Sequence, residues 1–231
     1  MTRTGDPLEK VVWNSLTTRH ARFALSTDMA RRFNPDISPF AATPDDTPES
    51  LSALASLLAG PQDEVFLLQV RPVALPATME LRMKADGLLL VKDRQIPQVK
   101  CSHPVLDLGA ADAQDMLDLA TLTKPGPFKL RTPELGSFIG VRIDGRLAAM
   151  AGERMNLEGH TEVSGVCTHP DFRGLGLAGA LSDQVARRIE ARGDTPFLHS
   201  YANNQGALKL YDKLGFTIRH PVHAAIAGLT A

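Results

Sequence analysis

The sequence is poor in cysteine, in aromatic residues and in long apolar runs. Its 231 residues include 2 cysteines and 1 tryptophan, and aromatic residues make up 5% of the chain. Two cysteines cannot build a disulfide framework, and no window provides the roughly 20 apolar residues that a membrane span needs. Residues 1–16 also lack the apolar core of a secretion signal. We therefore expect a cytoplasmic protein without a membrane partner.

Charge and histidine spacing argue against two further kinds of ligand. The formal net charge is −1, so the chain has no excess of positive charge for binding a nucleic acid or an anionic membrane. The 7 histidines show no spacing typical of metal ligands, and we expect no metal. With 43% hydrophobic residues, the chain can bury a core as one large domain or as two small ones.

The stretch 163–178 has the pattern of a strand, a glycine-bearing loop and the start of a helix. Gly174 and Gly176 allow backbone N–H groups to approach a ligand closely, and the N-terminus of a helix favours a phosphate. After Gly176, apolar residues recur at every fourth position, which predicts an amphipathic helix of about five turns. These apolar positions are Leu177, Leu181, Val185 and Ile189.

Two families use such a loop. Gly174, Gly176 and Gly179 fit the dinucleotide fingerprint, but residues 169–173 separate them from the preceding strand. They also lie in the last quarter of the chain, which leaves too little sequence for the rest of a doubly wound sheet. A dinucleotide-binding oxidoreductase is therefore the weaker alternative.

The better match is the segment Arg173-Gly174-Leu175-Gly176-Leu177-Ala178, which resembles the Arg/Gln-x-x-Gly-x-Gly/Ala signature of the GNAT superfamily of N-acetyltransferases. Residues 168–172 precede it in the family manner, and residues 204–216 resemble the family's Asn-x-x-Ala-x-x-x-Tyr-x-x-x-Gly-Phe segment. The resemblance covers residues 104–231 and implies the GNAT acyl-CoA N-acyltransferase fold, an α/β (α+β) mixed sheet with helices on both faces. Residues 1–103 lie outside it, and we interpret them as an accessory region or a degenerate second copy of the fold.

The resemblance implies transfer of an acetyl group from the cosubstrate acetyl-CoA directly to a primary amine of a small molecule or peptide. A CoA-binding sensor or interaction module that has lost catalysis is the non-enzyme alternative. The acceptor is not defined by the sequence, because family acceptor sites are built from variable early helices and loops. A homodimer stays open as well.

The resemblance also assigns cofactor contacts. The cofactor pyrophosphate is expected at the backbone of the glycine loop, and the pantetheine arm is expected to pair like an extra strand with residues 166–168. A bulge at Ser164-Gly165 is expected to free a backbone N–H near Val166 for the thioester carbonyl. The expected cofactor-binding residues are Val166, Cys167, Thr168, Arg173, Gly174, Leu175, Gly176, Leu177, Ala178, Gly179 and Asn204.

Two proton transfers complete the implied reaction. By resemblance Tyr211 is the general acid that protonates the leaving thiolate. Glu162 stands where several family members carry a strand glutamate, and we expect it to be the general base. Glu153 on the preceding predicted strand and a water molecule are the competitors. Cys167 lies in a predicted buried strand, where a small apolar side chain is a simpler interpretation than a nucleophile.

Local patterns predict the surrounding elements. Thr47 and Pro48 predict the start of a helix that ends before Gly60, and Gly215 ends the last helix. Asp86-Gly87 and Asp144-Gly145 each predict a hairpin turn. Further strands are expected at 65–70, 105–108, 137–143, 146–155, 161–168, 196–201, 216–219 and 222–227, and helices around 113–120, 177–192 and 203–214.

Overall fold

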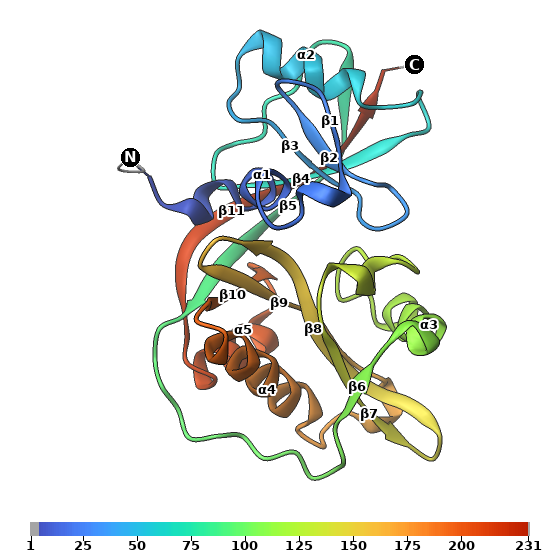
Figure 1. Ribbon diagram of the computed structural model, residues 1–231, viewed down its shortest axis with the longest axis vertical. Coiled ribbons are helices and arrows are strands. Elements are labelled where there is room, and N and C mark those ends of the chain that lie inside the picture. The colour runs from blue at the N-terminus through green and yellow to red at the C-terminus, as the bar shows by residue number, and fades with distance from the viewer. Residues whose placement is uncertain (1–4, 231) are drawn as a thin grey trace.

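The computed structural model describes residues 5–230 (Figure 1). Its strands are β1 (Ala24–Ser26), β2 (Arg31–Phe33), β3 (Phe40–Ala42), β4 (Glu64–Gln69), β5 (Met79–Lys92), β6 (Leu106–Leu108), β7 (Phe138–Ile143), β8 (Arg146–Leu157), β9 (His160–Thr168), β10 (Thr195–Tyr201) and β11 (Phe216–Leu229). Its α-helices are α1 (Val11–Thr17), α2 (Pro48–Ser56), α3 (Ala113–Thr123), α4 (Leu177–Ala191) and α5 (Gln205–Lys213).

Within these described residues, the strands form one mixed sheet in the order β1-β2-β3-β4-β11-β5-β10-β9-β8-β7-β6. Helices α4 and α5 pack on one face of its lower part and α3 packs on the other (Figure 1). The expected mixed sheet with helices on both faces is therefore confirmed. None of the helices between residues 5 and 230 is long and apolar enough to cross a membrane.

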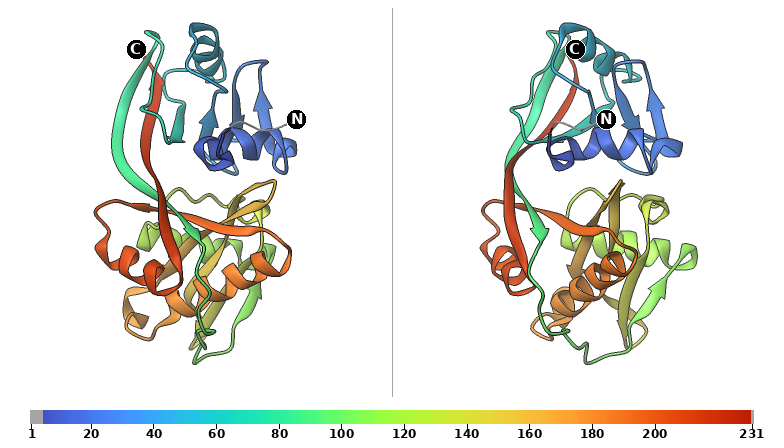
Figure 2. Two further views of the ribbon diagram at one scale, coloured as in Figure 1. Left: turned by 90° about the vertical axis from the view of Figure 1, so that its left-hand side faces the viewer. Right: turned by 60° about the vertical axis from the view of Figure 1, so that its left-hand side comes forward.

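Two long strands connect an upper and a lower lobe. β5 and β11 pair antiparallel from Met79–Leu229 to Lys92–Phe216 and run along one side of the molecule (Figure 2). In the upper part β11 also pairs with β4, whereas in the lower part β5 pairs with β10. We call α1, α2, β1–β4 and the upper halves of β5 and β11 the N-terminal lobe, and the remainder the C-terminal lobe.

The hairpin expected at Asp86-Gly87 is wrong, because β5 runs straight through both residues. Gly87 pairs with Tyr201 on one side and with Val222 on the other. A Cβ at Gly87 would lie 3.0 Å from Val222 Cγ2 and 3.2 Å from the Ser200 carbonyl oxygen. The glycine therefore serves the close approach of three strands, which a sequence pattern cannot distinguish from a turn.

The last two expected strands are also one. β11 continues through Pro221, and its register against β5 shifts between Ile218 and His220. Proline has no N–H to donate to a neighbouring strand, so a sheet accommodates it best beside such an irregularity. The hairpin at Asp144-Gly145 is confirmed, with φ values of 50° and 78° for the two turn residues between β7 and β8.

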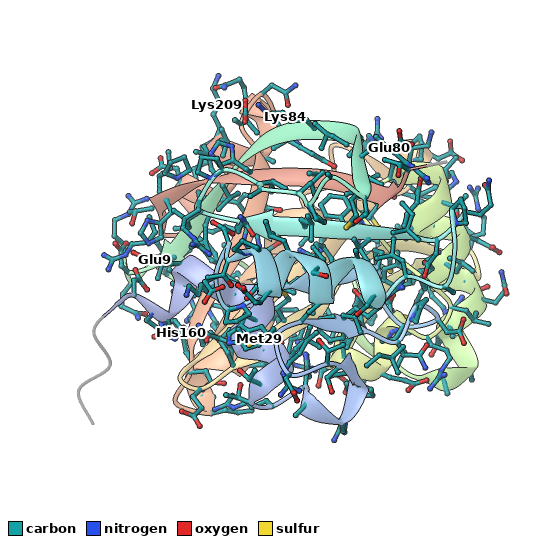
Figure 3. All side chains as sticks on the ribbon, turned by 90° about the horizontal axis from the view of Figure 1, so that it is seen from above. Glu9, Met29, Glu80, Lys84, His160 and Lys209 are labelled. Atoms are coloured by element: carbon teal, nitrogen blue, oxygen red, sulfur yellow. The ribbon has the colours of Figure 1, made fainter. Side chains whose placement is uncertain are left out.

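The predicted helix starts and ends agree well with the structure. The Thr47 side chain accepts a hydrogen bond from the Ser50 N–H at 3.3 Å, and Pro48 is the first residue of α2. Helix α5 is followed by Gly215 with a φ of 87°, where a Cβ would lie 2.2 Å from the Arg94 carbonyl oxygen. Charged side chains such as those of Glu9, Glu80, Lys84 and Lys209 project outward from the surface (Figure 3).

The two lobes share a hydrophobic core. Leu16, Phe33 and Phe40 of the N-terminal lobe belong to the same buried cluster as Met155 and Phe197 of the C-terminal lobe. Polar contacts across the interface add to it: His20 Nε2 donates to the Leu135 carbonyl oxygen at 2.9 Å, Thr132 Oγ1 donates to the Ile37 carbonyl oxygen at 2.7 Å, and Arg19 Nη2 donates to Asp194 Oδ1 at 3.0 Å.

The division expected at residues 103 and 104 does not follow the sheet. β5 precedes this boundary in the sequence, yet it lies between β10 and β11. The segment between β5 and β6 then wraps past α4, where Val99 N donates to Asp183 Oδ2 at 2.9 Å and Arg187 Nη2 donates to the Ile96 carbonyl oxygen at 2.9 Å. That residues 1–103 are a degenerate copy of the fold stays a prediction.

Candidate active site

β9 and β10 separate partway along their length, and this opening defines the site. The two parallel strands pair only from His160–Thr195 to Glu162–Phe197. β9 then continues to Thr168 and β10 to Tyr201 without further pairing between them. The edge of β9 that faces β10 beyond Glu162 therefore has backbone groups available for an extended ligand.

A bulge on β9 lies beside the opening. Ser164 pairs with Gly152 and Cys167 pairs with Met150, so Gly165 and Val166 together face the single residue Ala151 on β8. Gly165 has a φ of 62°, and a Cβ there would lie 2.9 Å from Phe138 Cε1. The expected bulge at Ser164-Gly165 is confirmed, and it requires a residue without a side chain.

The glycine loop and the start of α4 form one end of the opening. Gly174 and Gly176 have φ values of 84° and 71°, and no atom lies within 4 Å of a Cβ placed on either. Gly176 is the N-cap of α4 and no side chain caps this end. The first N–H groups of the helix are therefore available to an anion, as is usual for a phosphate site.

A cavity of about 1150 Å³ fills the space between this loop, the edge of β9, α5 and the N-terminal lobe. Ten of the eleven expected cofactor-binding residues line it, whereas the Leu175 side chain is 48% exposed and faces solvent. The Oγ1 of Thr168 is buried at this wall without a hydrogen-bond partner. A ligand that offers an acceptor or donor along β9 would satisfy it, so the residues present fit a polar extended arm.

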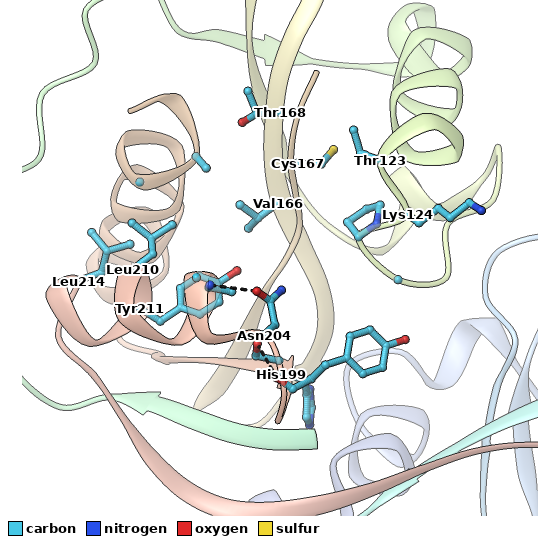
Figure 4. A pocket seen from close by; sticks show the side chains of 18 of the residues that line it. Thr123, Lys124, Val166, Cys167, Thr168, His199, Asn204, Leu210, Tyr211 and Leu214 are labelled. Atoms are coloured by element: carbon cyan, nitrogen blue, oxygen red, sulfur yellow. Dashed lines mark hydrogen bonds between the residues drawn. The ribbon is translucent and has the colours of Figure 1, made fainter. Parts of the chain in front are cut away.

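Helix α5 brings two of the expected residues to the cavity. Figure 4 shows Asn204 and Tyr211 beside Val166 of β9. Asn204 caps α5, since its Oδ1 accepts from the Ala207 N–H at 3.1 Å, and its amide N–H groups stay available. Burial, and then the charge of Glu162, raises the pKa of Tyr211 to about 12, so this phenol is protonated at neutral pH.

Glu162 lies behind the cavity wall and is 0% exposed. Its carboxylate accepts from Arg154 Nε at 2.9 Å, from Arg154 Nη2 at 2.6 Å and from His199 Nδ1 at 2.7 Å. Burial by itself would raise the pKa of Glu162, but the charges and hydrogen bonds of Arg154 and His199 outweigh it and lower the pKa to about 2. This carboxylate is therefore held ionised and does not face a substrate directly.

Glu153, the competing carboxylate, does not line the cavity either. It is buried on β8 and accepts from Arg192 Nη2 at 2.8 Å. His199 does line the cavity, and it makes no hydrogen bond other than that to Glu162 within residues 5–230. Sequence reasoning missed His199, and its alternation with Phe197 and Tyr201 along β10 is the one signal that could have pointed to it.

Cys167 is an unsuitable nucleophile. Its side chain is buried, and burial raises the pKa of its thiol to about 11 against a smaller opposing effect of a hydrogen bond with Thr123. The thiolate, not the thiol, is the reactive form. A covalent acyl-cysteine route is therefore disfavoured at neutral pH.

The N-terminal lobe supplies the far wall of the cavity. Phe40, Phe66 and Leu68 line it from β3 and β4, and Val222 and Ala224 line it from β11. No sequence motif marks these five residues, because their place in the site depends on pairing between strands that are far apart in the sequence.

Comparisons with known proteins define the class. The FR47-like protein family matches residues 138–223. The chain is 41% identical to an acetyltransferase assigned to the GNAT family from Novosphingobium aromaticivorans, over 98% of this chain and 100% of that one, with a TM-score of 0.91. The chain therefore belongs to the GNAT family of acetyltransferases. No curated protein matches it.

Two more distant structures share the fold over nearly the whole chain. A GCN5-related N-acetyltransferase from Kribbella flavida is 18% identical, with 96% of this chain and 95% of that one covered and a TM-score of 0.65. A GCN5-related N-acetyltransferase-like protein from Streptococcus suis is 16% identical, with 98% and 95% covered and a TM-score of 0.62. The arrangement of both lobes is thus common to these structures.

Proposed function

We propose that the protein transfers the acetyl group of acetyl-CoA directly to a primary amine. The observation that supports this most is the opening between β9 and β10, which leads from the uncapped start of α4 to Tyr211 and His199 in one cavity. Bound acetyl-CoA supplies the acetyl group as a thioester. A buried protonated thiol at Cys167 favours direct transfer over an acyl-enzyme.

The chain's own residues divide the binding work along the cavity. The N–H groups at the start of α4 and the Arg173 side chain hold the pyrophosphate. The free edge of β9 at residues 166–168 pairs with the pantetheine arm, and Asn204 donates to it. The backbone N–H near Val166, freed by the bulge at Gly165, donates to the thioester oxygen where negative charge develops.

Two side chains move protons in the proposed reaction. As the amine nitrogen bonds to the acetyl carbon and the carbon–sulfur bond breaks, Tyr211 gives its hydroxyl proton to the leaving sulfur. His199 takes the proton from the amine at Nε2. Glu162 accepts the hydrogen bond from His199 Nδ1 and so holds the ring and its tautomer, which makes it a positioning residue.

Calorimetric titration with acetyl-CoA and with NADH tests the proposal. We expect micromolar or tighter affinity for acetyl-CoA and none for NADH. Gly176→Glu should abolish acetyl-CoA affinity, since it places bulk and negative charge where a phosphate sits. Gly193→Glu is the matched control, because Gly193 has a φ of 86° and open space around it but follows the other end of α4.

A screen of primary amines with detection of released thiol then separates an enzyme from a CoA-binding module. Acetyl-CoA affinity without turnover of any amine would favour the module. NADH affinity without acetyl-CoA affinity would overturn the assignment of the cavity altogether.

A further inference from the structure

The charged side chains of the described cavity wall are all positive. Within the part of the chain that the structure describes, no Asp or Glu side chain lines it. Glu162 lies behind the wall, and its oxygens are already paired with Arg154 and His199. The charged side chains that do line the cavity are Lys124, Arg154, Arg173 and Lys213.

The wall formed by the N-terminal lobe is apolar. Phe66 and Leu68 of β4 lie in register with Ile226 and Ala224 of β11, and the Phe40 and Phe66 rings are 5.0 Å apart between centroids. The Arg154 guanidinium lies 4.7 Å from the centroid of the Phe40 ring. His199 is thus within a cavity whose far side offers aromatic and aliphatic surface.

These two features select against one kind of amine and for another. A second ammonium group on the acceptor would lose its hydration near the buried Arg154 and would find no anionic partner among the described residues that line the cavity. An apolar body, in contrast, gains from leaving water against Phe66 and Leu68. The amine that reacts must itself be neutral, so it makes no demand for a carboxylate contact.

We infer that the acceptor is an amine with a single basic nitrogen on an aromatic or aliphatic body, and that polyamines and aminoglycosides are poor acceptors, because no carboxylate of residues 5–230 lines the cavity. This inference rests on the proposed function, because it names the acceptor of that same site. The N-terminal lobe is the specificity element, since it supplies the apolar wall.

Matched amines test the inference. Phenethylamine and ethylamine differ only in the phenyl group, so burial of the ring should raise kcat/KM for phenethylamine by roughly 10- to 100-fold. Spermidine and kanamycin should be acetylated at least 10-fold less efficiently than phenethylamine. Calorimetric titration of the CoA complex with each amine should give the same order without turnover.

A pair of neighbouring leucines supplies a sharp control. Leu68→Ala removes apolar surface from the cavity wall and should lower the preference for phenethylamine over ethylamine by roughly 3- to 10-fold. The affinity for acetyl-CoA should stay unchanged. Leu67→Ala removes the same volume from the opposite face of β4, where Leu67 belongs to a different buried cluster, and should leave the preference intact. Val222→Ala is a second removal from the cavity wall if Leu68→Ala does not fold.

The outcomes distinguish failure of the acceptor inference from failure of the proposed function. A preference for spermidine or kanamycin, or an unchanged phenethylamine preference in both Leu68→Ala and Val222→Ala, would overturn the inference while the acetyltransferase proposal stands. If the parent protein did not bind acetyl-CoA, or if it acetylated no amine, the proposed function itself would be overturned.

Discussion

Tyr211 combines burial with a place on the cavity wall. Replacing it by Phe removes only the hydroxyl, so packing against Phe216, whose ring centroid is 6.0 Å away, is retained. We expect Tyr211→Phe to lower turnover by roughly 10²- to 10⁴-fold, the usual contribution of a positioned general acid, and to leave acetyl-CoA affinity nearly unchanged. Single-turnover kinetics and calorimetry measure the two quantities.

Tyr201→Phe is the control for this change, because Tyr201 also lines the cavity but is 42% exposed on β10. Its turnover should stay near that of the parent protein. Turnover of Tyr211→Phe within a few-fold of the parent would assign Tyr211 to packing alone.

The pH dependence of turnover in variants of Glu162 and His199 distinguishes the roles of the two side chains. His199→Gln should lower turnover at neutral pH by roughly 10²-fold or more and less at high pH, where free amine is abundant. Glu162→Gln should also lower turnover, but it leaves the buried Arg154 charge without its partner and should destabilise the fold by roughly 3–5 kcal/mol. If His199→Gln kept the parent pH profile, a water molecule would be the base.

The Glu162 carboxylate also makes the free energy of unfolding depend on pH. The pKa of Glu162 is lowered from 4.5 to about 2 in the folded protein, so the unfolded chain binds more protons in that window. Its contribution to stability is present above pH 4.5 and is lost as the pH falls towards 2. Urea unfolding at several pH values should show this loss, and Glu162→Gln should reduce the slope.

The sequence alone predicted several residues of the candidate site and missed others, and the difference has a physical reason. Motif spacing brought Gly176, Asn204 and Tyr211 to one cavity, because each sits at a fixed place relative to a helix start or a helix face. The role of Glu162 depends on Arg154 and His199, which approach it only through strand pairing. No local pattern encodes such partners.

At the scale of single elements, β5 depends on a glycine where three strands meet. Gly87→Ala should destabilise the protein by roughly 1–3 kcal/mol, because its Cβ would meet Val222 Cγ2 at 3.0 Å and the Ser200 carbonyl oxygen at 3.2 Å. Val222→Ala should relieve part of that cost in the double variant. Urea unfolding and a double-mutant cycle measure the coupling.

Gly60→Ala is the matched control, since its φ is ordinary and nothing lies within 4 Å of its Cβ position. It should change stability little. A cost of Gly87→Ala that Val222→Ala leaves untouched would mean that crowding between strands is not its cause.

Elements were predictable where their signal is local. The start of α2, the length of α4 and the turn at Asp144-Gly145 follow from caps, apolar periodicity and turn chemistry. The sequence pattern divides β5 at Gly87 and β11 at Pro221, because both residues are typical of turns. In the structure each strand continues through its residue, which the neighbouring strands accommodate. Long-range pairing therefore decided both cases against the local signal.

For the whole molecule, β5 determines whether the two lobes can be separated. Division of the sequence after residue 103 suggests that a chain beginning at Ser102 folds and binds acetyl-CoA by itself. The strand order gives the opposite expectation, because such a chain lacks the strand that pairs with both β10 and β11. It also lacks Leu16, Phe33 and Phe40, which share a core with Met155 and Phe197.

We therefore expect the chain that begins at Ser102 to aggregate and to bind no acetyl-CoA, since it exposes two strand edges and half of a buried cluster. Coexpression with residues 1–101 as a separate chain should restore a soluble complex, because the missing strand and core are then supplied in trans. Size-exclusion chromatography and calorimetric titration report the two properties. A monomeric, acetyl-CoA-binding product from Ser102 onward would mean that β10 and β11 pair with each other without β5, and the N-terminal lobe would then serve the acceptor wall alone.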